Sequence, residues 1–192
     1  MLRTLGVLGG MGPLATASFM NQVIALSPAK NDQEHIPMFI RNIPQIPDRT
    51  KFLMGLEDEN PFFELKKGFK ELTSLGVSCI VIPCNTAHYW YDALTKNADV
   101  HTISIVKSVI KQVKTTGKQK VGILATTATL NMGIYQNAFK QHNIDFVEPN
   151  TQQQATIMDG ITAVKAGDLN KGRHLLSKAY DLMLAQGADC VL

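Results

Sequence analysis

Three features of the sequence predict an α/β fold with two similar lobes, each holding a mainly parallel sheet flanked by helices. Short apolar runs that suit buried strands alternate with longer stretches in which apolar residues recur at helical spacing. Glycine turns separate several of these runs from the helices that follow. The two halves of the chain also repeat one another weakly. Strands that alternate with helices form βαβ units, and such units build parallel sheets.

The first half opens with a strand, a glycine turn and a helix. We expect the strand at residues 4–8, the turn at Gly9-Gly10-Met11-Gly12-Pro13 and the helix at 15–26, because proline suits a first helical turn. A second strand contains Phe39-Ile40. The proline-punctuated loop 42–50 follows, in which neither a helix nor an inner strand can persist. Such a stiff loop can hold polar groups in place.

A helix, a strand and another helix complete the first half. Apolar residues at near-helical spacing predict a helix over residues 61–75, and Gly76 ends it. The apolar run 77–82 predicts a buried strand, and residues 86–96 read as a helix.

The second half continues the same alternation. In order, we expect an extended piece at Ile103 and Ile105, a helix over 106–115 ending at Gly117, a strand over 121–124, a helix over 130–141, a strand at Phe146, and helices over 151–166 and 168–186.

Two pairs of matching strings reveal the internal repeat. Leu5-Gly6-Val7-Leu8 matches Val121-Gly122-Ile123-Leu124, and the string 75–81 matches 186–192. We therefore expect lobes at residues 1–100 and 101–192, facing each other across a ligand cleft. In this alignment Cys190 corresponds to Cys79 inside a strand, where a buried apolar role is expected. The counterpart of Cys84 would follow Leu192, so the second lobe is expected to be cut short, as in a truncated chain.

Composition excludes several classes of protein. The 192 residues are 45% hydrophobic and 18% charged, with a net charge of +3 and no basic stripe, which disfavours a nucleic-acid surface. Three irregularly spaced cysteines predict neither a disulfide framework nor a structural metal site. No stretch suits a signal peptide or a membrane span, so we expect a cytoplasmic protein without a membrane partner.

Cys84 is the main candidate for chemistry. It follows the apolar run Ile80-Val81-Ile82-Pro83, and helix-starting residues come after it. The carboxyl ends of parallel strands are where open α/β sheets bind ligands, and the amide dipoles of a following helix favour a thiolate. The alternative from position alone is a buried cysteine that only packs.

Three strings in the chain are distinctive when taken together: Leu8-Gly9-Gly10-Met11-Gly12-Pro13, Pro83-Cys84-Asn85-Thr86-Ala87-His88 and Gly187-Ala188-Asp189-Cys190-Val191-Leu192. With them, the chain resembles the aspartate/glutamate racemase family over essentially its whole length. The resemblance implies inversion of an acidic amino acid without pyridoxal phosphate, metal or nucleotide, and therefore no cofactor. Two cysteines, one from each lobe, would act on opposite faces of the substrate. Racemisation needs this arrangement because one base removes the Cα proton while another group returns a proton to the opposite face.

The resemblance also implies substrate contacts near the α-carboxylate, where negative charge develops and hydrogen-bond donors are needed. The candidates are Met11 and its neighbouring amides, Asn85, Thr86, Ala87, Thr126 and Thr127. Each has a structural alternative. Asn85, Thr86 and the two threonines of the second lobe suit helix starts, and Met11 suits a core. His88, one helical turn after Cys84, could assist the thiolate, but it is more typical of a solvated or packed helix histidine than of a catalytic one.

Arg49 and Lys165 are the residues that the resemblance assigns to the distal carboxylate. An arginine fork grips a carboxylate in two places and a lysine adds a point charge, which together favour a small dicarboxylic amino acid, aspartate or glutamate. Without the resemblance, both residues read as solvated surface charges. Family members often form homodimers, so a homodimer is one expected assembly, although no motif in this chain decides it.

Four other functions remain open alternatives. Related cysteine enzymes isomerise maleate, decarboxylate malonate or racemise hydantoins, and a non-catalytic module could bind an anion at Gly9-Gly10-Met11-Gly12. The family's second cysteine, usually in a Gly-Cys-Thr-Glu string, is absent from these 192 residues. We therefore expect this chain to invert substrate poorly, with Cys84 exchanging the α-proton of one face.

Overall fold

The computed structural model describes residues 3–192 and divides the chain into two units. The first unit runs to Ile105 and the second from Val106 to Leu192. The strand His101–Ile103 pairs with Cys79–Val81, so the first unit extends five residues beyond the boundary expected at residue 100.

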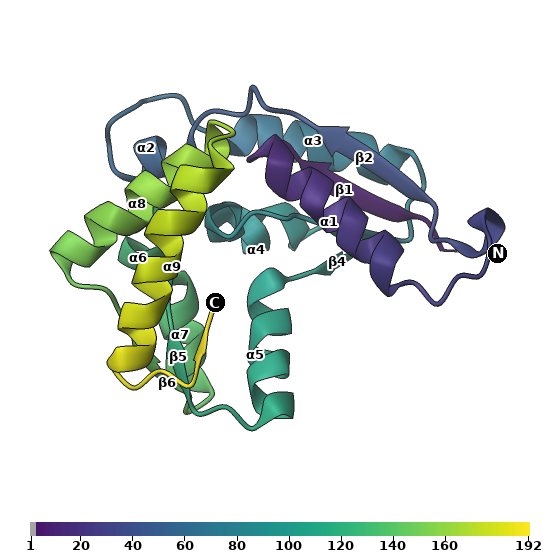
Figure 1. Ribbon diagram of the computed structural model, residues 1–192. Coiled ribbons are helices and arrows are strands. Elements are labelled where there is room, and N and C mark those ends of the chain that lie inside the picture. Colours follow the sequence, from purple (N-terminus) through teal and green to yellow (C-terminus); the bar gives the residue numbers. More distant parts are fainter. Residues whose placement is uncertain (1–2) are drawn as a thin grey trace. The chain divides into compact units, whose positions relative to one another are not determined.

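The first unit alternates strands with helices (Figure 1). Its elements in chain order are β1 (Leu5–Gly9), α1 (Pro13–Leu26), the 3₁₀ helix η1 (Asp32–Glu34), β2 (Met38–Asn42), α2 (Arg49–Leu53), α3 (Phe62–Ser74), β3 (Cys79–Val81), the 3₁₀ helix η2 (Thr86–Trp90), α4 (Tyr91–Thr95) and β4 (His101–Ile103).

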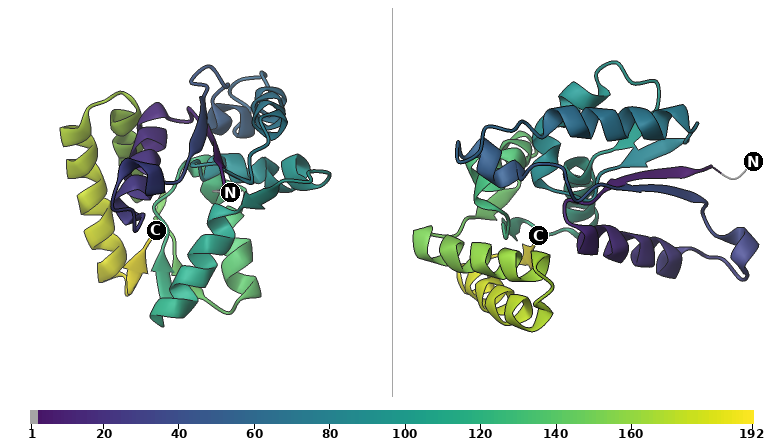
Figure 2. Two further views of the ribbon diagram at one scale, coloured as in Figure 1. Left: turned by 90° about the vertical axis from the view of Figure 1, so that its right-hand side faces the viewer. Right: turned by 90° about the horizontal axis from the view of Figure 1, so that it is seen from above.

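All strands of the first sheet are parallel, in the order β2-β1-β3-β4. Side chains alternate between its two faces, as the pleat requires. Leu5 and Val7 pack toward α1, whereas Leu8 packs in a larger core with Leu65 and Phe69 of α3. Figure 2 shows α1 and α3 on opposite sides of this sheet. The sheet is therefore covered on both faces, as is usual for parallel strands.

The turn after β1 depends on close backbone packing. Gly10 has a φ of +98°, and a Cβ added there would lie 2.4 Å from backbone atoms of Ile43. The Gly10 N–H donates a 2.9 Å hydrogen bond to the Thr16 hydroxyl, which donates in turn to the Gly12 carbonyl over 3.2 Å. The glycine string thus sets the chain direction between β1 and α1.

The second unit has its own parallel sheet in the order β6-β5-β7. Its elements are α5 (Ile105–Thr116), which starts at the last residue of the first unit, followed by β5 (Lys120–Gly122), α6 (Thr127–Asn131), α7 (Ile134–Gln141), β6 (Asp145–Val147), α8 (Thr151–Lys165), α9 (Leu169–Ala185) and β7 (Cys190–Val191). Helices α8 and α9 pack side by side, and they approach closely at Gly160 and Gly172 (Figure 1).

Strand register confirms the internal repeat. In each sheet the first strand lies in an inner position, with the next two strands of its unit on either side. Leu5 of β1 pairs with Cys79, and Val121 of β5 pairs with Cys190. The matching sequence strings therefore occupy matching places in the two sheets.

Two expected helices differ from the structure. The helix expected over 130–141 is two helices, α6 and α7, because Gly133 adopts a left-handed φ of +64° between them. The segment 86–96 begins as the 3₁₀ helix η2 and only then becomes α4. The α/β fold with two parallel, helix-flanked sheets is as predicted.

Candidate active site

Cys84 lies beyond the carboxyl end of β3, next to the ends of β1 and β4 in the sheet. Its backbone N–H donates a 2.7 Å hydrogen bond to the Ile82 carbonyl, which closes a tight bend around Pro83. The side chain is partly buried and packs against the larger core of the first unit. The strand end therefore holds this thiol at the edge of the core.

The residues after Cys84 turn into the core rather than away from it. Thr86 is 4% exposed and Ala87 is fully buried. Asn85 precedes η2, but its side chain does not cap that helix. The capping role that sequence suggests for Asn85 is therefore not the one it plays here.

His88 bonds two backbone groups at once. Its Nδ1 lies 2.9 Å from the Cys84 carbonyl oxygen, and its Nε2 lies 3.0 Å from the backbone nitrogen of Ile105. Burial lowers its pKa below the ordinary value, while the bond to the Cys84 carbonyl acts in the opposite direction. The imidazole is thus a buried group whose two ring nitrogens both face backbone atoms, one of them the carbonyl oxygen of Cys84.

Arg49 is a buried cation. Its side chain is 7% exposed, and its Nη1 donates to the carbonyl oxygens of Ile46 at 2.9 Å and Pro47 at 2.7 Å. Its buried Nε has no hydrogen-bond partner, and no ion pair within residues 3–192 joins Arg49 to a carboxylate. The sequence alone suggested an exposed charge, so burial without a counter-ion is a finding of the structure.

One core connects the three loops that carry these groups. Met11 from the turn after β1, Ile46 from the loop after β2 and Trp90 of η2 all belong to it. Phe52 of α2 also lies against Trp90, with ring centroids 6.1 Å apart. Met11 is 5% exposed, so its side chain has the packing role that was its structural alternative. The loops bearing Cys84 and Arg49 therefore share a common support.

The two threonines of the second unit have different local roles. The Thr126 hydroxyl accepts from the Thr129 N–H at 3.2 Å and caps α6. The Thr127 hydroxyl instead accepts a 3.1 Å hydrogen bond from the Nε2 of Gln154, and its N–H points at the sulfur of Met158 over 3.3 Å. The helix-start alternative thus describes both residues, Thr126 as the cap and Thr127 as the first residue of α6. In addition, Gln154 of α8 orients the Thr127 hydroxyl.

A cavity of about 560 Å³ lies where β5 and β6 end, lined by Thr127, Glu148 and Gln154 among others. Gln136 is 7% exposed and donates a 2.7 Å hydrogen bond to the Glu148 carboxylate. The buried Oε1 atoms of Gln136 and Gln154 have no partner within residues 3–192. Sequence reasoning missed both glutamines, because their partners lie 6 to 29 residues away and no local spacing marks them.

Lys165 is an exposed residue at the far end of α8. At a rise of about 1.5 Å per residue, its Cα lies roughly 10 Å along the helix axis beyond Met158, which contacts Thr127. Lys165 therefore lies on the same helix as the residues that contact Thr127, but it is not adjacent to Thr127.

The other two cysteines lie inside strands. Burial raises the pKa of the Cys79 thiol, and burial followed by the nearby Asp189 carboxylate raises that of Cys190. Both shifts favour the protonated thiol, which suits a residue that packs.

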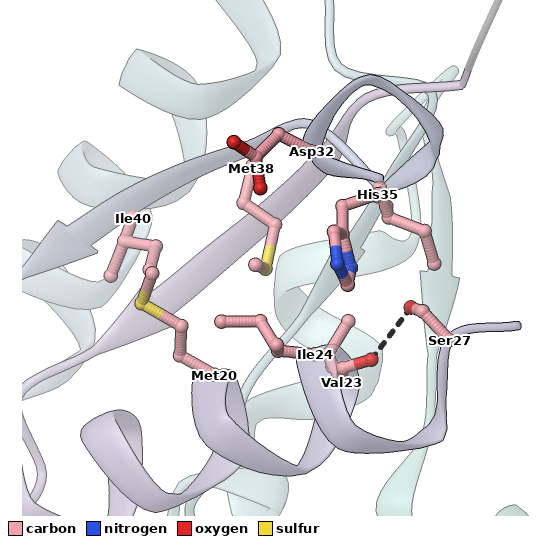
Figure 3. Close-up of a pocket in the computed structure, with 9 residues that line it drawn as sticks. Met20, Val23, Ile24, Ser27, Asp32, His35, Met38 and Ile40 are labelled. Carbon is pink, nitrogen blue, oxygen red and sulfur yellow. Dashed lines mark hydrogen bonds between the residues drawn. The ribbon is translucent and has the colours of Figure 1, made fainter. Parts of the chain in front are cut away.

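A second cavity, of about 410 Å³, lies between α1, η1 and β2 (Figure 3). Apolar side chains line most of it, together with Asp32 and His35. None of the predicted site residues lines it, so it is separate from the candidate site.

The described part of the chain has no cluster of three or more His, Cys, Asp or Glu residues arranged for a metal ion. None of the described helices has the length and apolar character that a membrane crossing requires.

The chain belongs to the Asp/Glu/hydantoin racemase family, whose model matches residues 8–192. It is 30% identical to the broad specificity amino-acid racemase RacX of Bacillus subtilis, over 98% of this chain and 82% of that protein. The structure of the Picrophilus torridus aspartate racemase superimposes with a TM-score of 0.89 at 29% identity, covering 98% of this chain and 79% of the other. A glutamate racemase of Corynebacterium glutamicum is 28% identical over 64% of this chain and 44% of its own length. This is a family of amino-acid racemases, which are isomerases.

Proposed function

We propose that the protein racemises an acidic amino acid, aspartate or glutamate, without a cofactor, and that Cys84 is one of two bases. The observation that carries this proposal is the buried Arg49 guanidinium. Its Nε has no hydrogen-bond partner, and no carboxylate of the described residues forms an ion pair with it. Burying a charge without a counter-ion is costly, so such a group is suited to an anion that arrives from solution. A substrate carboxylate fits the arginine fork.

The place of Arg49 supports this role. Helix α2 begins at Arg49 and packs against η2, the segment that follows Cys84. A distal carboxylate bound at Arg49 would therefore be held on the same side of the sheet as the thiol. We retain Lys165 as a proposed second cation, and Asn85, Thr86, Ala87, Thr126, Thr127 and the amides near Met11 as proposed substrate contacts.

The reaction needs only proton transfers. The Cys84 thiolate takes the proton from Cα, and the electron pair of the broken C–H bond moves into the α-carboxylate, where hydrogen-bond donors stabilise it. A thiol on the opposite face then returns a proton to Cα, so the configuration inverts and the second sulfur becomes the thiolate. Cys190 is not our candidate for that thiol, because it occupies the strand position equivalent to Cys79.

Exchange in deuterated water tests the proposal. The 192-residue chain is incubated with each enantiomer of aspartate and glutamate, NMR follows loss of the α-proton signal, and chiral chromatography follows inversion. We expect exchange on one enantiomer with little inversion, and loss of that exchange in Cys84→Ala but not in Cys79→Ala. Full exchange by Cys84→Ala would remove Cys84 from the mechanism, and rapid inversion by the parent chain would contradict the two-cysteine scheme.

The likeness to RacX favours a second candidate, a racemase with a broader range of amino acids. Alanine and lysine as substrates separate the two. An enzyme that selects through Arg49 will process neither, whereas a broad enzyme will process both and will be little affected by Arg49→Met. Turnover of maleate in place of amino acids would instead support a related isomerase.

A further inference from the structure

We propose that His88 is a positioning residue for Cys84, which it serves by holding the Cys84 carbonyl and the first backbone N–H of α5 with one neutral imidazole. The inference rests on the proposed role of Cys84 as a base. His88 itself is assigned no contact with substrate.

The two hydrogen bonds determine the tautomer. A backbone N–H can only donate, so the Nε2 that faces Ile105 must be the unprotonated nitrogen. The hydrogen of a neutral imidazole then resides on Nδ1, which faces the Cys84 carbonyl and donates to it. Neither the other tautomer nor the imidazolium can make both bonds, because each would place a hydrogen on Nε2.

These bonds hold the backbone of Cys84 from both sides. Its N–H is bound to Ile82 and its carbonyl to His88. The 84–85 peptide is planar and trans, so its carbonyl and the Asn85 N–H point in opposite directions. Holding the carbonyl therefore also aims the Asn85 amide, and it restricts the directions that the Cys84 Cα–Cβ bond can take.

The imidazole is itself held in place. It is 7% exposed and stacks on Tyr91, with centroids 5.5 Å apart and planes 7° apart. The Tyr91 hydroxyl donates a 2.7 Å hydrogen bond to the carbonyl of Thr102, the middle residue of β4. His88 thus ties the loop after β3 to the loop after β4, two neighbouring strands. An unprotonated Nε2 also satisfies a helix-start N–H of α5 that has no partner within its own helix.

The experiment compares variants that separate packing from hydrogen bonding. His88→Phe keeps a ring against Tyr91 but makes neither bond, whereas His88→Gln retains a donor and an acceptor. Tyr91→Phe is the matched control, since it keeps the stacked ring and loses only the hydroxyl. For each folded variant we measure α-proton exchange with aspartate, as kcat and KM separately, and the rate at which iodoacetamide alkylates Cys84, read by mass spectrometry of its peptide.

We expect His88→Phe to lower the exchange kcat by up to about 100-fold with KM nearly unchanged, because small misplacements of a reacting group have effects of this size. The alkylation rate of Cys84 should also change, His88→Gln should recover part of both losses, and Tyr91→Phe should have a much smaller effect. A purely structural role would change the melting temperature alone.

Two results would overturn the inference. One is a folded His88→Phe variant with parental kcat and alkylation rate. The other needs no phenylalanine variant: in the parent chain labelled with ¹⁵N-histidine, NMR should show His88 with a protonated Nδ1 and a bare Nε2, and any other state contradicts it. Either result leaves the role of Cys84 intact, whereas exchange by Cys84→Ala would remove that role whatever His88 does.

Discussion

Gln154 donates a 3.1 Å hydrogen bond to the hydroxyl oxygen of Thr127, across 27 residues of sequence. The same Nε2 lies 3.1 Å from the carbonyl oxygen of Ala125, a residue that is 3% exposed. Because the Thr127 oxygen accepts from Gln154, its own hydrogen points elsewhere. One side chain of α8 thus arranges the loop that follows β5.

Replacing Gln154 by Leu is expected to destabilise the second unit. The Ala125 carbonyl would lose a partner inside the protein, which typically costs about 1–3 kcal/mol. Urea unfolding measures this loss. Gln152→Leu is the matched control, because Gln152 is an exposed residue on the same helix. An equal loss in both variants would mean that the Gln154 hydrogen bonds contribute nothing of their own.

Arg49→Met is expected to separate substrate binding from stability. Loss of a charge-assisted hydrogen bond to a carboxylate is worth about 1.5–3 kcal/mol, so the KM for aspartate should rise about 10-fold to 100-fold. Arg49→Met removes an unpaired buried charge, which is stabilising, but it also removes the donor to the Ile46 and Pro47 carbonyls, so the two effects oppose each other and the free energy of unfolding should change little.

The control for Arg49 is Arg41→Met. Arg41 is exposed and paired with Glu71 at 2.5 Å, so its loss should change neither the KM nor, to any large extent, the stability. Steady-state exchange kinetics and urea unfolding check both variants. A parental KM in Arg49→Met would show that Arg49 does not bind substrate.

Gly10→Ala is expected to lower the free energy of unfolding by at least about 2 kcal/mol. An alanine there would have to keep a φ of +98° and place its Cβ against the Ile43 backbone, which cannot give way as a side chain can. Gly12→Ser is the comparison, because open space surrounds that position and serine suits the start of α1. Chemical denaturation of the two variants should differ clearly, and similar stabilities would show that the turn relaxes freely.

The stability of the protein should depend on pH through His88. Because burial holds its folded-state pKa below the ordinary value of about 6.5, the unfolded chain binds more protons as the pH drops below that value. The free energy of unfolding should therefore have its full His88 contribution above about pH 6.5 and lose it as the pH falls through the folded-state pKa. His88→Gln should remove this part of the slope. Urea titrations at a series of pH values measure it, and an unchanged slope in the variant would assign the effect to other groups.

Local patterns were sufficient to predict most of the secondary structure. Gly76 and Gly117 end helices with left-handed φ values of 70° and 67°, as their places after apolar helical runs indicate. The helix expected over 130–141 was wrong at Gly133, since a single glycine inside a helical pattern can be tolerated or can break the helix. Which occurs depends on packing, and packing is not a local property.

For the candidate site, the sequence could predict which residue types take part and where Cys84 lies, but not which side chains are buried or which distant groups they bind. Cys84 could be placed at a strand end because strand, proline and thiol are consecutive in the chain. The burial of Arg49 without a counter-ion could not be foreseen, because a guanidinium reads as a surface charge until the surrounding core is known. Gln154 and Gln136 had no signal, since their partners come from distant segments.

The sequence by itself determined the alternation of strands and helices, the repeat that relates Leu5 to Val121 and Cys79 to Cys190, and the motifs of the racemase family. These are properties of neighbouring residues, and neighbours are adjacent in any conformation. Only the tertiary structure decided that Arg49 is buried, on a loop that shares a core with Cys84. It also decided that Gln154 of α8 orients Thr127, and that His88 joins the Cys84 carbonyl to the first N–H of α5. Such relationships depend on which distant segments the packed core brings within hydrogen-bond distance, and no periodicity in the chain encodes that distance.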